Sequence, residues 1–168
     1  VIGLMGDGTP GVAQWVRLVP QPQSNNLMYG VVDQRSDLNT RFWNGAAWDT
    51  VVAHPEHDAT VEDINDRNFD IVFETFPANL GRAWLVWGEG NLVGRKMWNG
   101  AGWGAQANTG DDTALVQLFA HPVSGDVLAA IYEDRTSATD DIREMHLTGG
   151  SAVWTALTQI WPGQTVNN

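Results

Sequence analysis

The sequence predicts an all-β chain made of three antiparallel repeats, each with three to four short strands. The first observation is a motif, W-N-G-x-x-W, that occupies residues 43–48, returns 55 residues later at 98–103, and has a degenerate third copy at 146–154. The second is that short runs rich in Val, Leu and aromatic residues precede each copy and are separated by Pro and Gly turns. The third is that helix signals are nearly absent. A fixed period of this kind is typical of repeat architectures.

The repeat boundaries follow from these copies. We place the repeats at residues 15–54, 55–108 and 109–160, after a Gly-rich N-terminal segment, residues 1–14, that is either a lead-in or an exchanged strand. The first and third repeats are the most alike, because Val16-Arg17-Leu18 matches Val116-Gln117-Leu118. The second repeat keeps the same rhythm with different residues.

Each repeat is expected to contain one strand before a Pro or Gly turn, one after it and one that leads into the W-N-G motif. Asn-Gly favours a type I′ hairpin because both residues tolerate positive φ, so the two Trp residues of each motif should face each other. A fourth, edge strand is predicted after each motif, at residues 50–54, 104–108 and 155–160. Residues 137–147 carry the best helix signal, and we interpret them as an inserted loop with one helical turn.

Composition excludes several functions. The chain has 168 residues, no Cys and a formal net charge of −11, with 20 Asp and Glu against nine Lys and Arg. An acidic surface repels phosphate backbones and anionic lipids, so we expect neither a nucleic-acid partner nor membrane insertion. The lack of Cys removes disulfides and thiol nucleophiles.

Catalytic signatures are missing from the sequence. There is no G-x-S-x-G, no H-E-x-x-H and no nucleophile–base pair, and the adjacent carboxylates at 111–112 and 140–141 lie on predicted loops. We therefore predict that the chain is not an enzyme.

Four residues beside the hairpins are the candidate ligand-binding set. Arg41 and Arg95 each precede a hairpin Trp, Trp43 and Trp98, and stacking of Arg on Trp within the fold is the simplest explanation for the pairing. If the Trp rings are exposed, the same pairs would form a repeated sugar site.

An acidic stretch in the second repeat is the candidate metal site. Oxygen-bearing side chains recur on nearly alternate residues there, as a Ca²⁺ loop requires: Asp63, Asn65, Asp66, Asn68 and Asp70. The stretch lacks the Gly and the terminal Glu of an EF-hand, so a plain acidic turn is the favoured interpretation and structural calcium the alternative. No other cofactor is predicted.

The pattern W-V-R-L, P-x-S and W-N-G-x-x-W over residues 15–154 resembles blade repeats of large secreted or surface proteins of bacteria that are β-propeller-like. The hairpins alone also resemble turns of six-bladed fucose-binding lectins. Those lectins hold the sugar with an Arg, a Glu and a stacking Trp, and residues 27–29 and 84–87 lack that Arg, so fucose recognition is not implied. Three blades do not close a propeller and leave strand edges unpaired, so the resemblance implies completion by another chain.

Together these observations predict a non-catalytic extracellular structural or adhesive module of a bacterial or archaeal cell surface. It would act by self-association into a filament or surface assembly, with itself or neighbouring repeats of a larger chain as partner. The alternative function is a carbohydrate-binding, lectin-like module whose partner is a glycan.

Overall fold

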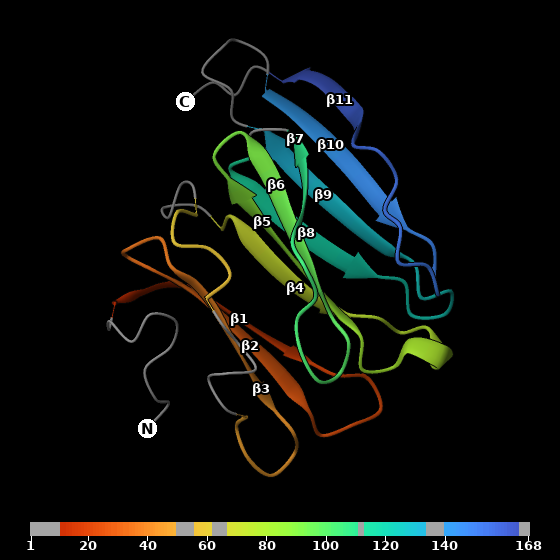
Figure 1. Cartoon of the computed structure of the whole chain (residues 1–168). Coiled ribbons are helices and arrows are strands. Elements are labelled where there is room, and N and C mark those ends of the chain that lie inside the picture. The colour runs from red at the N-terminus through yellow and green to blue at the C-terminus, as the bar shows by residue number, and fades with distance from the viewer. Residues whose placement is uncertain (1–10, 50–55, 62–66, 111–112, 134–139, 165–168) are drawn as a thin grey trace.

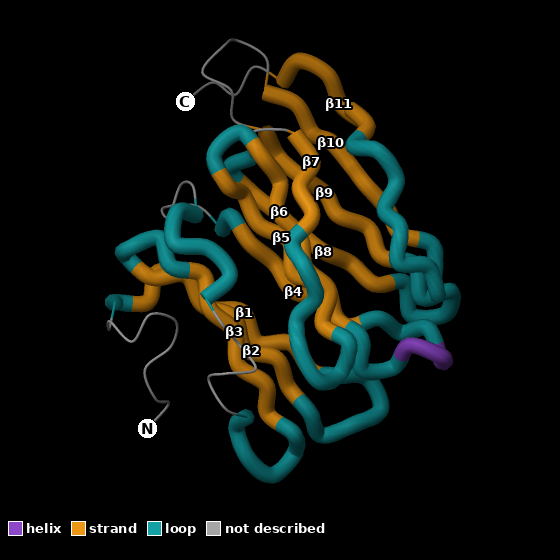
Figure 2. The backbone as a smooth tube through the Cα atoms, in the orientation of Figure 1, coloured by secondary structure: helices purple, strands orange, loops and turns teal. Residues whose placement is uncertain are grey.

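The chain is an all-β protein with three antiparallel sheets (Figures 1 and 2). The structure, a computed structural model, describes residues 11–49, 56–61, 67–110, 113–133 and 140–164. In these ranges no α-helix occurs, and the one helical turn is the 3-10 helix η2 (Pro77–Asn79). The all-β prediction is therefore confirmed.

Each sheet is a simple meander in which strands that follow one another in sequence are paired. The first sheet has the order β1 (Ala13–Pro20), β2 (Leu27–Asp33), β3 (Leu38–Trp43). The second has the order β4 (Phe69–Phe73), β5 (Ala83–Glu89), β6 (Leu92–Trp98), β7 (Ala107–Gly110). The third consists of β8 (Leu115–Ala120), β9 (Val127–Glu133), β10 (Asp140–Leu147) and β11 (Thr158–Gln164).

The three sheets are stacked in chain order, with the second between the other two (Figure 1). We call the face of a sheet that is directed toward the preceding sheet its leading face, and the opposite face its trailing face. One core joins the first sheet's trailing face to the second sheet's leading face, through residues such as Met28, Phe42, Ile71 and Leu85. The other core joins the second and third sheets in the same way.

Strand register makes the three sheets directly comparable. Pro20 pairs with Leu27, Phe73 with Ala83 and Ala120 with Val127, each at the same end of the first strand pair. Counting from these pairs, positions 16, 69 and 116 are equivalent, as are 18, 71 and 118. All of these positions lie on leading faces because side chains alternate along a strand.

A close approach explains one glycine of the first core. A Cβ at Gly30 would lie 2.5 Å from Ile71 Cδ1 and 2.9 Å from Phe69 Cε2, so a side chain there would force these two core residues to shift. The leading face of the second sheet thus fits directly onto the backbone of the first sheet's trailing face.

The W-N-G hairpins differ from the predicted type I′ turn. Positive φ occurs at Gly45 and Gly100 but not at the preceding Asn44 and Asn99. Instead Asn44 Oδ1 accepts hydrogen bonds from the amides of residues 46 and 47, at 3.0 and 2.9 Å, and Asn99 does the same in the second motif. The Asn side chain therefore closes a four-residue loop, and the type I′ prediction is wrong.

The third repeat contains the main secondary-structure error. Residues 140–147 form β10, which pairs with β9 along its whole length, rather than the predicted loop with a helical turn. Burial of Met145 and Leu147 in the second core outweighs the local capping signal. Register also places Leu147, not His146, at the position of Trp43 and Trp98, because Leu147 pairs with Val127.

Fourth strands are present in two of the three sheets. β7 overlaps the predicted edge strand at 104–108, and β11 overlaps the one at 155–160. The one at 50–54 and most of the N-terminal segment, residues 1–10, lie outside the described residues.

Candidate functional site

The leading face of the first sheet is apolar and uncovered. Val16 and Leu18 are each 53% exposed, whereas their equivalents in the third sheet, Val116 and Leu118, are 0% and 3% exposed. The half-buried side chains of Leu27 and Tyr29 extend the same face. Val16 and Leu18 are therefore exposed at positions whose equivalents in the other two sheets are buried.

The trailing face of the third sheet is the counterpart. Phe119 is 54% exposed and Leu128 is 37% exposed, while the equivalent Val19 and Met28 of the first sheet are 8% and 0% exposed. Phe119 and Leu128 are register partners on neighbouring strands, so the exposed apolar surface is contiguous.

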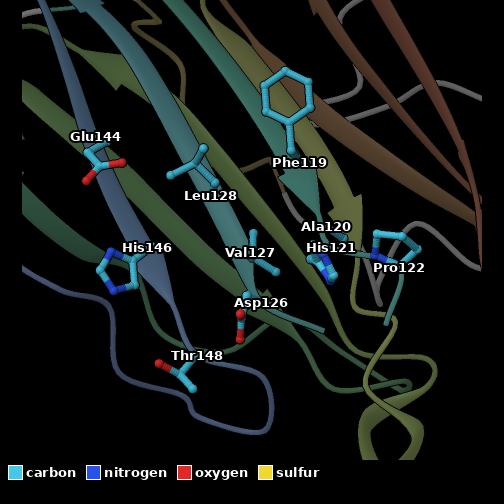
Figure 3. Close-up of a pocket in the computed structure, with 10 residues that line it drawn as sticks. All are labelled: Phe119, Ala120, His121, Pro122, Asp126, Val127, Leu128, Glu144, His146 and Thr148. Carbon is cyan, nitrogen blue, oxygen red and sulfur yellow. The ribbon is translucent and has the colours of Figure 1, made fainter. Parts of the chain in front are cut away.

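A hollow of about 580 Å³ lies on this trailing face (Figure 3). Figure 3 shows Phe119 and Leu128 over its apolar part, with Glu144 and His146 projecting from β10 beside them. The polar end of the hollow is formed by His121, Asp126 and Thr148.

Asp126 fixes the shape of that polar end. Its carboxylate accepts hydrogen bonds from the Gly149 amide at 2.7 Å and from the Ser124 hydroxyl at 2.8 Å. The Gly149 hydrogen bond, followed by that of Ser124, lowers the pKa of Asp126 below its ordinary value. The hollow is therefore bounded by a turn that stays anchored while the carboxylate is ionised.

The two predicted sugar-stacking Trp residues have different surroundings. Trp98 is 1% exposed, lies in the first core and packs against Phe42 with ring centroids 5.4 Å apart. Trp43 is half-buried on the uncovered leading face, where it contacts Trp48 edge-on at 5.6 Å. Of these two rings, Trp43 is therefore the one that is partly exposed.

The two predicted arginines bind oxygen atoms. Arg41 donates to the Asp49 carbonyl oxygen and lies 3.5 Å from the Asp49 carboxylate. Arg95 donates to the Thr109 hydroxyl, and partial burial lowers its pKa. Among the described residues the cation over a Trp ring is Lys96, 5.5 Å from the centre of Trp87.

Of the predicted calcium residues, Asp63, Asn65 and Asp66 lie outside the described residues. Asn68 is buried, and its backbone carbonyl oxygen accepts a hydrogen bond from the Gly88 amide at 3.0 Å. Within the ranges that the structure describes, no group of three or more His, Asp and Glu residues is arranged to hold a metal ion.

Asp70 has a different environment from the one that a calcium loop would give it. Its carboxylate, almost fully buried, lies 2.6 Å from Arg17 Nε of the first sheet and accepts the Leu118 amide of the third sheet at 2.9 Å. Arg67 approaches the same carboxylate at 3.7 Å. Asp70 therefore connects all three sheets, and its oxygens already have cationic and amide partners.

Sequence reasoning missed the uncovered faces. It assigned the missing contacts to strand edges, whereas Val16, Leu18 and Phe119 are apolar residues that are more than half exposed on sheet faces. Val16 and Leu18 recur 100 residues later as Val116 and Leu118, and this match is the sequence signal for the exposed face, because both pairs are apolar although only the second member of each is buried.

No protein-family model and no curated protein sequence matches the chain. Among solved structures it is similar to an exo-β-1,3-galactanase variant from Phanerochaete chrysosporium that was crystallised with β-1,3-galactotriose. The TM-score is 0.53 and the identity 10%, over 91% of this chain and 37% of the galactanase chain. The chain thus spans little more than a third of that enzyme, and the likeness concerns the fold alone. The described residues contain no helix with the length and apolarity that a membrane crossing requires.

Proposed function

We propose that the chain is a non-catalytic structural module that self-associates head to tail. The leading face of one copy's first sheet would pack on the trailing face of another copy's third sheet. The observation that carries this proposal is the exposure of Val16, Leu18, Phe119 and Leu128 at positions whose equivalents are buried, or half-buried in the case of Val72, where a neighbouring sheet is present. Burial of apolar area is the main driving force of such an association.

The packing inside the chain supplies the expected contact in detail. Ile71 of the second sheet lies over Gly30 of the first. The equivalent pair between copies is Leu18 over Ala130, at the centre of the two uncovered faces. Leu18 and Tyr29 would then fill the hollow beside Phe119, so its volume is the space that an incoming sheet needs.

A polar contact is expected to accompany this packing. Between the first and second sheets, the indole N–H of Trp103 donates to Thr40 Oγ1 at 3.0 Å. Trp48 occupies the position of Trp103 in its motif, and register makes Glu144 the equivalent of Thr40. The Trp48 indole of one copy would therefore donate to the Glu144 carboxylate of the next, a charge-assisted bond at the edge of the interface.

The contact is heterologous, since it joins two different faces. Such a contact produces a closed ring when its rotation closes and a filament when it does not. The side-by-side first strands, β1 next to β4 and β4 next to β8, support a β-propeller-like arrangement in which the sheets act as blades and the ring is completed by another copy. An extracellular location at a bacterial or archaeal cell surface remains part of this proposal.

Sedimentation velocity of the purified chain tests the proposal. We expect the wild-type chain to form dimers or longer assemblies, and Leu18→Asp and Phe119→Asp each to be monomeric with an unchanged circular dichroism spectrum. Val153→Asp is the matched control, because Val153 is 77% exposed but lies on neither face. A wild-type chain that stays monomeric up to millimolar concentration would overturn self-association and leave neighbouring repeats of a longer chain as the occupants.

Carbohydrate binding is the second candidate function. The partly exposed Trp43 ring and the galactotriose bound by the structurally similar galactanase favour it. A glycan array would then show binding that Trp43→Ala removes without unfolding the chain. Binding that survives this substitution would exclude Trp43 as the sugar platform, and Trp98→Ala should unfold the chain rather than act on sugar.

A further inference from the structure

A second cavity, of about 350 Å³, lies between the second and third sheets, away from both uncovered faces. The residues that line it include two tryptophans and one arginine together with smaller apolar side chains: Trp84, Arg95, Met97, Ala107, Val153 and Trp154. The volume lies in the range of small-molecule sites. Because this cavity is formed within one chain, it does not depend on the proposed assembly.

The equivalent place between the first and second sheets is filled. There Thr40 Oγ1 lies 2.7 Å from His57 Nε2 and accepts the Trp103 indole N–H, while the His57 ring packs edge-on against Trp103 at 4.8 Å. Residues 56–61 thus supply a buried side chain, His57, that packs between these two sheets, while Thr40 of β3 accepts the indole hydrogen bond.

Between the second and third sheets the same elements are arranged around an open space. Register puts Arg95 in the place of Thr40, and Arg95 is directed to Thr109 instead of a Trp. Trp154, which closes the third motif as Trp103 closes the second, packs on Trp84 with ring centroids 5.3 Å apart. Its indole nitrogen is buried and has no hydrogen-bond partner among the described residues.

The polar side-chain groups that line this cavity are hydrogen-bond donors. Arg95 is the charged residue among the described residues that line it, and both a guanidinium and an indole N–H are donors without acceptor capacity. An occupant must therefore supply acceptors, and a carboxylate matches the guanidinium in charge and geometry. The indole and Met97 surfaces favour a ring with an apolar face rather than a small inorganic anion.

We propose that this cavity binds a carboxylated sugar ring of monosaccharide size, a hexuronic acid, with its carboxylate on Arg95 and its ring against Met97 and the Trp84–Trp154 pair. The ligand would take the place that His57 occupies between the first two sheets. It would also offer hydroxyl oxygens to the unpartnered Trp154 N–H after a small movement of the ring.

Isothermal titration of the full chain with galacturonate and glucuronate tests this assignment, with galactose, glucose and benzoate as comparison ligands. We expect at least one hexuronate to bind and the neutral sugars to bind about tenfold more weakly or worse, since a charge-assisted bond is lost. Arg95→Gln should weaken hexuronate binding by a similar factor, and Arg35→Gln, a change at an exposed arginine of the first sheet, should not.

A cavity-filling variant and a matched control on the same strand distinguish loss of the cavity from loss of folding. Ala107→Leu projects into the cavity from the edge strand β7 and should abolish binding, whereas Asn108→Leu, on the opposite face of the same strand, should leave it intact. Absence of hexuronate binding to the folded wild-type chain would overturn the proposal. So would equal binding of galactose, binding of benzoate alone, or hexuronate binding that Ala107→Leu leaves unchanged.

Discussion

The second sheet is packed on both faces, whereas the first and third sheets are each packed on one. All three have the same alternation of apolar residues, so the difference does not come from local sequence preference. Positions 16 and 116 are both Val and positions 18 and 118 are both Leu, yet only the third-sheet members are buried. Each repeat therefore carries apolar residues at the positions that contact a neighbouring sheet, whether or not the chain itself supplies that sheet.

The two hairpin tryptophans show the same contrast. Trp43 and Trp98 occupy equivalent leading-face positions, since each pairs with the first residue of the preceding strand. Trp98 is covered by the first sheet, and Trp43 has no preceding sheet to cover it. The partial exposure of Trp43 is therefore explained by the lack of a sheet packed on it, and a bound ligand is not needed to explain it.

The largest contrast is expected from truncating the equivalent leucines. Leu118→Ala should lower the free energy of unfolding by about 2–5 kcal/mol because it leaves a cavity in the second core. Leu18→Ala should change it by less than about 0.5 kcal/mol in the monomer, since Leu18 is already exposed. Urea denaturation at a protein concentration that keeps the chain monomeric measures both. Equal losses would contradict the assignment of Leu18 to an uncovered face.

A smaller contrast is expected at positions 70 and 117, which are equivalent by register. Asp70→Ala leaves the buried Leu118 amide without its acceptor and removes the partner of Arg17, so we expect a loss of about 2–3 kcal/mol. This expected loss is smaller than the loss for a fully buried ion pair, because Arg17 is partly exposed and its guanidinium can be solvated when Asp70 is removed. Gln117→Ala, on the third sheet's trailing face, should cost less than about 0.5 kcal/mol. Denaturation of the two variants side by side checks this, and a similar cost at both positions would show that Asp70 does not connect the sheets.

The smallest effect is expected from pH at the rim of the hollow. The pKa of Asp126 is lowered in the folded chain, so its contribution to stability is present above the ordinary Asp value, near 4, and is lost as pH falls through the lowered value. Asp126→Asn should therefore lower stability modestly at neutral pH, leave stability below the lowered pKa nearly unchanged, and so flatten the acid side of the stability curve below about pH 4. Thermal melts between pH 2 and pH 7 measure the slope. An unchanged acid slope would mean that Asp126 does not hold the turn.

The sequence predicts much of this architecture for physical reasons. The Trp motif and the apolar alternation are local signals, so the three repeats and their strand class could be recognised from residues alone. The role of Asp70 could not, because Arg17 and the Leu118 amide meet it only after three sheets are stacked. An Asp inside the apolar run of β4 was nevertheless a hint that a buried partner exists.

The candidate site was predicted less well than the fold. Trp43, Trp98, Arg41 and Arg95 look equivalent in sequence, but whether each is covered depends on which sheet lies in front of it. Burial of this kind is a tertiary property. The opening beside Arg95 likewise depends on tertiary packing, because among the described residues no side chain fills it as His57 fills the equivalent place between the first and second sheets.

Mixing two single-face variants tests the central claim most directly. Leu18→Asp blocks the leading face and Phe119→Asp blocks the trailing face, so each variant alone should be monomeric. An equimolar mixture should form a dimer of one copy of each, because the intact trailing face of the first variant meets the intact leading face of the second. Sedimentation velocity that shows this 1:1 dimer and nothing longer is the predicted result. Self-association of either variant alone, or a mixture that remains monomeric, would contradict a head-to-tail contact between these two faces.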